Sequence, residues 1–325
     1  MTASVKVLVT GGAGFIGSHL VDKLVEEGCK VKILDDLSNG ELRNIEDHLV
    51  EGRVEFIEGS IVDPEAVKMA VADVDALVHL AAVVSVPYSV SNPRETFEVN
   101  AKGTERLLHQ CAVEHVKKFI FVSSCGVYGE PRYVPVDEIH PAYPLSPYAA
   151  SKFEAERICL KDCDTNGLET VVLRLFNVYG RRQGQNGYAG VITSFAERLT
   201  RGLPLIIYGD GLQKRDFVHV SDVVKAVWLA LTKPGAEGVF NIASGKPVSI
   251  NKLAKSMSKL VDIENPQMIH EKPRKGDIRQ SHGDYSKAKK TLGFTPETEL
   301  EDGLSGLLDS AYVIVDSVIR EAPVL

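Results

Sequence analysis

A glycine-rich turn between a strand-like run and a helix-like stretch constrains the fold of this chain more than any other feature. Residues 10–17 read TGGAGFIG. They follow the apolar, β-branched run KVLVT at Lys6–Thr10 and precede a stretch with helical spacing at His19–Glu27. A second strand-like run, KVKILD, occupies Lys30–Asp35. This order of strand, turn, helix and strand is the context in which such a glycine spacing predicts dinucleotide binding.

Each glycine of the turn has a physical role in that prediction. Gly11 permits a tight turn, Gly14 lets the backbone approach a pyrophosphate, and Gly17 lets the helix pack closely on the strand. The N-terminus of the helix supplies N–H donors and a favourable dipole to the phosphates. A purely structural turn is the alternative interpretation.

The carboxylate of Asp35 bears on the type of dinucleotide. It ends the second strand-like run, where it can accept hydrogen bonds from adenosine ribose hydroxyls and would repel the additional phosphate of NADP. The next residues, DLSNG at Asp36–Gly40, contain no arginine that could bind that phosphate. The sequence therefore favours NAD as the cofactor, with a turn-capping role for Asp35 as the alternative.

Further strand-like runs alternate with helical stretches over about the first 175 residues. The runs are apolar throughout, which is typical of parallel strands with helices on both faces. The strand-like runs are Arg53–Glu58, Ala76–Leu80, Lys118–Ser123 and Glu169–Leu173, and the helical stretches include Asn100–Glu114 and Tyr148–Asp162. The pattern predicts an α/β fold with a doubly wound parallel Rossmann sheet and a smaller C-terminal α/β substrate lobe.

The alternation breaks after this region, which suggests where the lobes divide. Residues 180–190 read GRRQGQNGYAG, a polar and glycine-rich segment typical of a loop. We expect residues 1–177 to form the NAD-binding domain, with 215–245 returning to it. Residues 178–214 and 246–325 are expected to form the substrate lobe.

Composition excludes several other classes of protein. The chain has 325 residues and a formal charge of −7, which argues against a nucleic-acid partner. Its five cysteines are scattered, so neither a disulfide framework nor a metal site is expected, and a reducing, cytoplasmic location is favoured. No apolar stretch is long enough to span a membrane, and the chain start lacks a signal-peptide pattern.

A candidate catalytic set comes from a YxxxK element and a strand-end serine. Tyr148 and Lys152 are four residues apart on a predicted helix, so they share one helix face. An ammonium beside a phenol lowers the phenol pKa from about 10, which makes Tyr148 a credible general base. Ser124 follows a predicted strand and can share a substrate hydroxyl with Tyr148. Ser123 beside it is interpreted as a backbone-capping serine.

Together, these motifs resemble the extended short-chain dehydrogenase/reductase superfamily. They are TGGAGFIG, Asp35, HLAA at His79–Ala82, Asn100, SSCGVYG at 123–129 and YAASK at 148–152. Three later motifs resemble its nucleotide-sugar members, above all UDP-hexose 4-epimerases of the UDP-glucose/UDP-N-acetylglucosamine type. They are RLFNVYGRRQ (Arg174–Gln183), YGDGLQKRDFVHVSD (Tyr208–Asp222) and RKGDIRQS (Arg274–Ser281).

The resemblance implies epimerisation at C4 of a UDP-hexose through a transient 4-keto sugar. Tyr148 would take the proton of the sugar 4-hydroxyl, and NAD would stay bound because the cycle is redox-neutral. The catalytic residues implied are Ser124, Tyr148 and Lys152. The implied cofactor-binding residues are Gly11, Gly14, Phe15, Ile16, Gly17, Asp35, Asp36, Leu37, Ser38, Asn39, Gly40, Ser60, Ile61, Leu80, Ala81, Ala82, Asn100, Tyr148, Lys152 and Phe176.

The resemblance also implies how the UDP-sugar is held. Arg215, Arg274 and Asn177 would bind the diphosphate, because a guanidinium holds phosphate oxygens through two bonds. Ser281 matches the position that gates the sugar C2 substituent, where serine admits an N-acetyl group and tyrosine excludes it. The implied substrate-binding residues are Val84, Ser124, Tyr148, Asn177, Val191, Ile206, Tyr208, Arg215, Arg274, Asp277 and Ser281, with Val191 and Ile206–Tyr208 at the uracil.

Several alternatives remain open on the same scaffold. Related dehydratases and decarboxylases resemble this chain at the cofactor site but carry an acidic residue just after the catalytic Ser or Thr, where Cys125 and Gly126 stand here. A UDP-glucuronate 4-epimerase and a non-catalytic NAD-sensing protein are the other candidates.

The chain departs from the family pattern at one position of the cofactor site. Many relatives have Asp in an EGD triplet at the adenine pocket where this chain has Ser60. By analogy with relatives, the helices Asn100–Glu114 and Tyr148–Asp162 suggest a homodimer.

Overall fold

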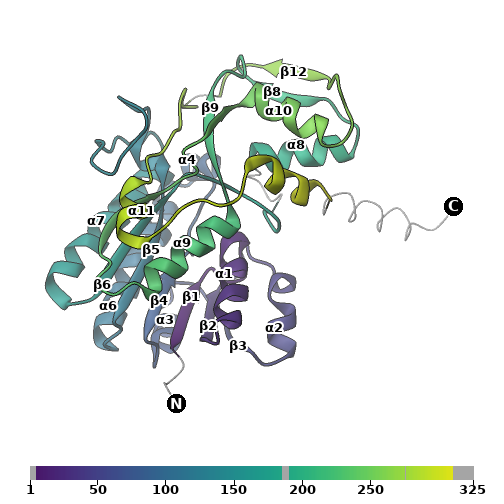
Figure 1. The fold of residues 1–325 in the computed structure, drawn as a ribbon. Coiled ribbons are helices and arrows are strands. Elements are labelled where there is room, and N and C mark those ends of the chain that lie inside the picture. The colour runs from purple at the N-terminus through teal and green to yellow at the C-terminus, as the bar shows by residue number, and fades with distance from the viewer. Residues whose placement is uncertain (1–4, 185–189, 275, 310–325) are drawn as a thin grey trace.

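Seven parallel strands form the central sheet of the computed structural model, which describes residues 5–184, 190–274 and 276–309 (Figure 1). The strands are β1 (Lys6–Thr10), β2 (Lys30–Asp35), β3 (Val54–Glu58), β4 (Ala76–His79), β5 (Lys118–Ser124), β6 (Glu169–Leu175) and β10 (Gly238–Ile242). Their spatial order is β10-β6-β5-β4-β1-β2-β3. The order reverses between β1 and β4, the switch point at which open α/β sheets bind ligands. The predicted doubly wound parallel sheet is confirmed.

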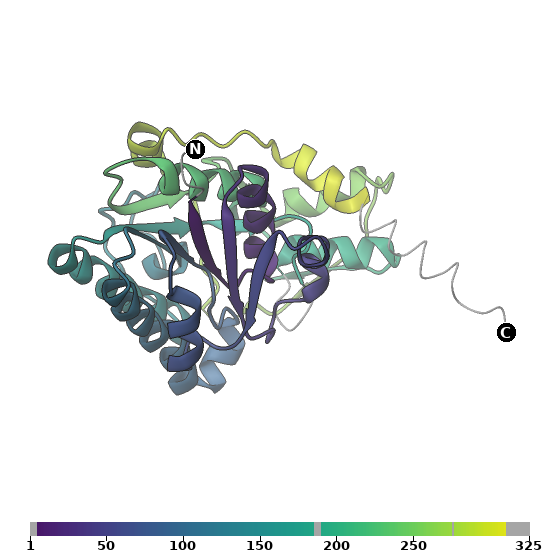
Figure 2. The same ribbon diagram turned by 90° about the horizontal axis from the view of Figure 1, so that it is seen from below.

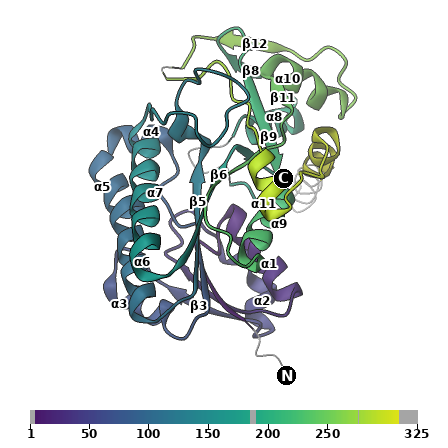
Figure 3. The same cartoon turned by 60° about the vertical axis from the view of Figure 1, so that its left-hand side comes forward.

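Helices cover both faces of this sheet (Figure 2, Figure 3). One face carries α1 (Phe15–Glu26), α2 (Glu46–Val50), α9 (Val220–Thr232) and α11 (Ser286–Leu292). The other face carries α3 (Pro64–Val71), α4 (Val86–Ser91), α5 (Pro93–Phe97), α6 (Gly103–Val113) and α7 (Pro147–Asn166). The inner strands β1, β4 and β5 are largely apolar because both of their faces are covered.

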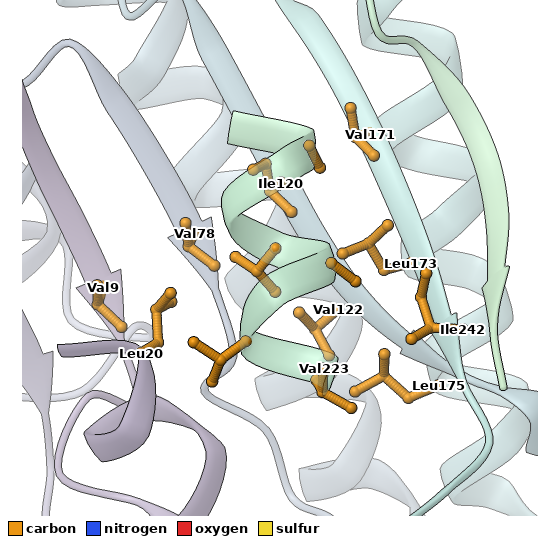
Figure 4. Packing of buried hydrophobic residues seen from close by; sticks show 14 of the residues in the cluster. Val9, Leu20, Val78, Ile120, Val122, Val171, Leu173, Leu175, Val223 and Ile242 are labelled. Carbon is orange, nitrogen blue, oxygen red and sulfur yellow. The ribbon is translucent and has the colours of Figure 1, made fainter. Parts of the chain in front are cut away.

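Buried side chains of the strands and helices form a core on each face. On the α1 and α9 face, Leu20 and Val223 pack with strand residues that include Val78 and Ile120 (Figure 4). Burial of one such side chain contributes about 1.5–3 kcal/mol. β3 lies at the sheet edge and is only partly buried, in keeping with its alternating sequence VEFIE.

A smaller lobe lies beyond the carboxyl ends of the strands (Figure 1). Its strands and helices are β7 (Asn177–Tyr179), α8 (Val191–Thr200), β8 (Leu205–Tyr208), β9 (Lys214–His219), β11 (Pro247–Ser249), α10 (Ile250–Lys259) and β12 (Met268–Glu271). β9 pairs with β7 and β11, and β8 pairs with β12.

The return of the chain to the central sheet differs in detail from the expected span 215–245. α9 packs against α1, and β10 pairs with β6, whereas β9 belongs to the small sheet. Of the segment assigned to the substrate lobe, residues 185–189, 275 and 310–325 lie outside the described residues.

The helix predicted over Asn100–Glu114 is present, and it continues without a break from α5. Glu98–Lys102 form a π-helical turn, and α6 starts at Gly103. Such turns occur frequently at functional sites. Across the described residues, every helix is too short or too polar to cross a membrane.

Candidate functional site

The glycine turn after β1 leaves backbone donors accessible at the start of α1. Gly11 has a φ of +71°, and a side chain there would meet the backbone N of Ala81 at 2.8 Å. A side chain at Gly17 would overlap the carbonyl oxygen of Gly11. Gly14 is the N-cap of α1, and as a glycine it has no side chain that could cap the first N–H groups of the helix. The turn therefore fits the diphosphate of a dinucleotide, whose oxygens would meet the N–H groups of the first helical turn.

Asp35 organises the loop at the end of β2. Its carboxylate accepts hydrogen bonds from the backbone N of Ala13 at 2.9 Å and the backbone N of Leu37 at 2.9 Å. Burial raises the pKa of Asp35 above its ordinary value. Each carboxylate oxygen can accept a further bond, so a turn-capping role and a ribose contact are compatible. The ribose contact stays a prediction.

Several other predicted cofactor residues directly follow strands of the central sheet. Ser60 and Ile61 follow β3, Leu80 to Ala82 follow β4, and Phe176 follows β6. Asn100 differs, because its side chain bonds to protein partners. Its Oδ1 accepts from the backbone N of Val83 at 2.7 Å, and its Nδ2 donates to the Val83 carbonyl and the Ser151 hydroxyl at 2.9 Å each. Asn100 thus fixes the loop after β4 to α7.

Tyr148 and Lys152 lie in the first two turns of α7. The Ser146 hydroxyl caps this helix by accepting from the backbone N of Ala149 at 3.2 Å, and Pro147 occupies its first turn. These residues define where α7 begins and hence where Tyr148 lies. Lys152 is buried, its Nζ is 4.2 Å from the Phe121 ring centroid, and burial lowers its pKa to about 8. Lys152 is therefore still a cation at neutral pH.

Ser124 ends β5, close to the start of α7. Its Oγ accepts a hydrogen bond from the backbone N of Gly126 at 3.1 Å, which begins the η3 turn (Cys125–Tyr128). A side chain at Gly126 would lie 3.3 Å from Ser124 Oγ and 3.6 Å from the Ala149 side chain. Ser124 and the residue after Tyr148 therefore flank the same small space.

Residues far apart in the sequence meet beside Ser124. Ser281 is buried, and its Oγ accepts a hydrogen bond from Asn177 Nδ2 at 3.3 Å. The Cys125 thiol also bonds to Ser281, and burial raises the pKa of this thiol to about 11. The candidate gate for the sugar C2 substituent thus adjoins the candidate catalytic serine. The protonated thiol fits the packing role expected for Cys125.

The candidate diphosphate and uracil residues lie in the smaller lobe. Arg215 forms an ion pair with Asp277, and the Arg274 guanidinium lies 3.8 Å from the Tyr208 ring centroid. Ile206 and Tyr208 are on β8, and Val191 opens α8. Val84 is exposed just before α4. Asp277 therefore pairs with a candidate substrate residue.

Two buried polar networks next to the site were not predicted from the sequence. Glu156 pairs with Arg174, and Ser123 donates its hydroxyl proton to Glu156. The capping role expected for Ser123 is therefore wrong. His79 lies within hydrogen-bond distance of two threonines. Glu156 could have been found from its position one helical turn after Lys152, which places it on the same face of the helix. A charged residue on a face that packs against the sheet is rarely buried unless it is paired, so the position predicts a buried partner.

Comparison with known proteins gives a consistent result. The family described as NAD dependent epimerase/dehydratase matches residues 7–243. A solved UDP-glucose 4-epimerase from Thermotoga maritima, determined with UDP-glucose, is 40% identical with a TM-score of 0.90, over 96% of this chain and 100% of that chain. A UDP-N-acetylglucosamine 4-epimerase from Methanobrevibacter ruminantium, in complex with UDP-N-acetylmuramic acid, is 36% identical with a TM-score of 0.90, over 96% and 99%.

A relative with a different reaction is also similar. A dTDP-glucose 4,6-dehydratase from an Actinoplanes species is 34% identical over 308 residues, which is 92% of this chain and 95% of that protein. Overall similarity therefore leaves more than one nucleotide-sugar reaction to consider, and the residues around Ser124 must separate them.

Proposed function

Because this chain belongs to the NAD-dependent epimerase/dehydratase family, we propose that it is a 4-epimerase of UDP-hexoses. Its cofactor is NAD, and the glycine turn and Asp35 are the residues that would hold the diphosphate and the adenosine ribose. We infer that its substrates are UDP-N-acetylglucosamine/UDP-N-acetylgalactosamine together with UDP-glucose/UDP-galactose. This choice of sugars rests on Ser281 and on the similarity to epimerases of both kinds.

The environment of Ser124 carries the choice of epimerase over dehydratase. The next two residues are Cys125 and Gly126, so neither supplies a carboxylate to move an additional proton. Burial raises the pKa of the Cys125 thiol to about 11, which keeps it protonated at neutral pH. The two residues after Ser124 therefore offer no second acid or base beside Tyr148, as epimerisation requires.

The side chains divide the work as follows. Tyr148 removes the proton from the sugar 4-hydroxyl and later returns it, while the Ser124 hydroxyl hydrogen-bonds the same sugar oxygen. The Lys152 ammonium favours the phenolate form of Tyr148. When bound, NAD supplies a reversible two-electron oxidation of the C4 carbinol. The sugar must turn over in the pocket between oxidation and reduction, so Arg215 and Arg274 anchor the diphosphate instead of the hexose.

A product assay tests this function directly. The purified protein is incubated with UDP-glucose, UDP-N-acetylglucosamine, UDP-glucuronate or dTDP-glucose, and the products are identified by NMR. We expect a UDP-glucose/UDP-galactose pair and the corresponding N-acetylated pair at equilibrium, without net consumption of NAD. A 4-keto-6-deoxy product would establish a dehydratase instead, and a UDP-glucuronate epimer alone would replace the proposed sugars.

A Ser281→Tyr variant is expected to lose the N-acetylated activity selectively. Ser281 is buried against Asn177 and Cys125, so a tyrosine ring must occupy space toward the sugar. Close-packed sites accept added volume at a cost of about 1–3 kcal/mol, which is about 5–150-fold in kcat/KM for the larger substrate. Rates with UDP-N-acetylglucosamine and UDP-glucose measure this change, and Ser281→Ala is the control that keeps the space open. Equal losses on both sugars would contradict the gate.

An Asp35→Ala variant is expected to weaken NAD binding and to narrow the preference for NAD over NADP. A hydrogen bond to a charged group contributes about 1.5–3 kcal/mol, so NAD affinity should fall about 10–150-fold. NADP affinity should fall less, because the repulsion of its additional phosphate is also removed. Calorimetry on cofactor-free protein measures both constants. Unchanged NAD affinity would mean that Asp35 only organises the turn through Ala13 and Leu37.

We further propose that the protein is a cytoplasmic homodimer formed through α6 and α7. Both helices lie on one outer side of the molecule (Figure 3). Val113 at the end of α6 is exposed, as are Val90 and Phe97 on the neighbouring short helices. Analytical ultracentrifugation tests the dimer, and a monomer at micromolar concentration would exclude it.

A further inference from the structure

A chain of buried hydrogen bonds runs from the glycine turn to the catalytic helix through His79. His79 ends β4 and is only 1% exposed. Its Nδ1 lies 2.8 Å from the hydroxyl of Thr10 at the end of β1. Its Nε2 lies 2.9 Å from the hydroxyl of Thr104 in α6. The proposed epimerase chemistry uses none of these three side chains.

The direction of these hydrogen bonds follows from the partners of the threonines. Thr104 donates its only hydroxyl proton to the carbonyl oxygen of Asn100 at 2.6 Å. Thr104 must therefore accept from His79, which places a proton on Nε2. In a neutral imidazole, Nδ1 is then an acceptor, and Thr10 donates to it. The Thr10 oxygen in turn accepts from the backbone N of Leu80 at 3.2 Å and of Ala81 at 3.3 Å.

Each end of the chain reaches a part of the active site. At one end, the backbone N of Ala81 is the atom that a side chain at Gly11 would strike, so Thr10 holds the loop that adjoins the glycine turn. At the other end, Asn100 Nδ2 donates to the Ser151 hydroxyl at 2.9 Å. Ser151 then donates to the carbonyl oxygen of Tyr148 at 2.8 Å. The cofactor turn and the catalytic tyrosine therefore share one buried network.

The surroundings of His79 keep its ring neutral. Phe119 and Phe121 of β5 pack against the ring, with centroid distances of 6.0 Å and 5.6 Å. Lys152 of α7 contacts the Phe121 ring and is the charged group that acts on His79, while β1 and α6 present only threonine hydroxyls to the imidazole. Burial, assisted by the Lys152 charge, lowers the pKa of His79 well below its ordinary value.

We propose that His79 is a positioning residue for the epimerase reaction: as a neutral imidazole protonated on Nε2, it holds the glycine turn and the first turn of α7 in a fixed relation. The expected effect on the reaction rate rests on the proposed function. The tautomer of His79 and the geometry of its hydrogen bonds do not depend on that function. Loss of the network would displace Tyr148 relative to the cofactor, and a displacement of about 1 Å can cost about 10²-fold in rate.

The first test is the tautomer itself, which needs no substrate. Histidine-labelled ¹⁵N protein, purified with its cofactor, is studied by long-range ¹H–¹⁵N NMR, with a His79→Gln sample to identify the signals. We expect Nε2 protonated and Nδ1 unprotonated, unchanged between about pH 5.5 and 8.5. An Nδ1-protonated ring, or titration within this range, would overturn the proposal.

The second test separates positioning from mere packing. Thr104→Val removes the acceptor for His79 and keeps the side-chain shape, whereas Thr104→Ser keeps the hydroxyl. Per folded, NAD-loaded molecule, we expect kcat to fall about tenfold or more in Thr104→Val and to stay within about twofold in Thr104→Ser. KM for UDP-glucose should change little in both, because the sugar nucleotide is expected to bind through the other lobe.

The outcomes distinguish the two proposals. An unchanged kcat per loaded molecule in Thr104→Val, with a lowered melting temperature, would make His79 a packing residue and overturn its positioning role. A wild-type protein without epimerase activity would refute the proposed function, while the NMR result would still decide the state of His79. If Thr104→Val does not fold, His79→Gln serves instead. Its Nε2 keeps a donor toward Thr104, but its acceptor Oε1 does not occupy the position of the imidazole Nδ1 that faces Thr10. For His79→Gln we expect a lower kcat and an unchanged KM for UDP-glucose. An unchanged kcat would overturn the proposal.

Discussion

In a Tyr148→Phe variant we expect the epimerase turnover to be lowered about 10²–10⁴-fold, while the fold and the bound NAD are kept. Phenylalanine retains the ring in the first turn of α7 but removes the oxygen that accepts the sugar proton. Lys152 remains a cation one helical turn away, since its pKa of about 8 is above neutral. Turnover is measured at saturating UDP-glucose, with thermal melting and bound NAD recorded on the same samples.

The same chemical change elsewhere provides the control for this prediction. Tyr143 is 70% exposed in the loop before α7, so Tyr143→Phe removes a phenol oxygen outside the site. This variant should keep its turnover within about twofold, because most exposed substitutions have small effects. If Tyr148→Phe retained more than about a third of the turnover, Tyr148 would not be the general base.

Much of the central sheet was predictable because its signals are local. A buried parallel strand needs a short apolar run, and the runs at β1 and β5 are buried almost throughout. The smaller lobe gave weaker signals, because β7 and β11 have three residues each and β9 begins with charged residues. Its strands are defined by pairing with distant segments, as β9 is with β11, and no sequence window contains that information.

The candidate site divides in the same way between local and distant relations. The glycine turn and the Tyr148–Lys152 pair are each contained within one turn or helix, so spacing alone predicts them. The contact of Ser281 with Asn177 and Cys125 joins three distant segments and was not predicted. Only the gating role of Ser281 was inferred, through resemblance to a family. The π-helical turn before α6 was missed because the helical spacing continues through it.

Buried polar networks were the least predictable part, for a physical reason. A buried histidine or glutamate is stable only with its partners, and those partners come from other elements. Ser123 illustrates this point. From sequence it is a small polar residue at a strand end, for which backbone capping is the ordinary role, but its hydroxyl bonds to Glu156 on α7.

The Glu156–Arg174 pair allows the second large prediction, on stability. Glu156 is 1% exposed and Arg174 is 6% exposed. Arg174 donates from Nε to Glu156 Oε1 at 3.0 Å and from Nη2 to Oε2 at 2.6 Å, and its guanidinium lies 4.7 Å from the Tyr128 ring centroid. Burial alone would lower the pKa of Arg174, but the hydrogen bonds and charge of Glu156 raise it. The buried guanidinium charge is thus compensated mainly by Glu156, with a smaller contribution from Tyr128.

A Glu156→Leu variant is expected to lose about 3–5 kcal/mol of the free energy of unfolding. Leucine is close to glutamate in volume, so the loss comes mainly from the buried Arg174 charge and not from a cavity. The Ser123 hydroxyl also loses its acceptor, which costs about 1 kcal/mol. Urea unfolding followed by fluorescence and circular dichroism measures the change in the cofactor-loaded protein.

The double variant Glu156→Leu/Arg174→Met decides whether this loss is electrostatic. Replacing a buried ion pair with apolar residues of similar volume is often neutral or stabilising, because two desolvated charges are removed together. The double variant should therefore recover most of the stability lost in Glu156→Leu, apart from about 1 kcal/mol at Ser123. If the stability loss of the double variant equalled the sum of the losses of Glu156→Leu and Arg174→Met, changed packing around α7 and β6 would explain the loss in Glu156→Leu. The unpaired charge would then not be the cause.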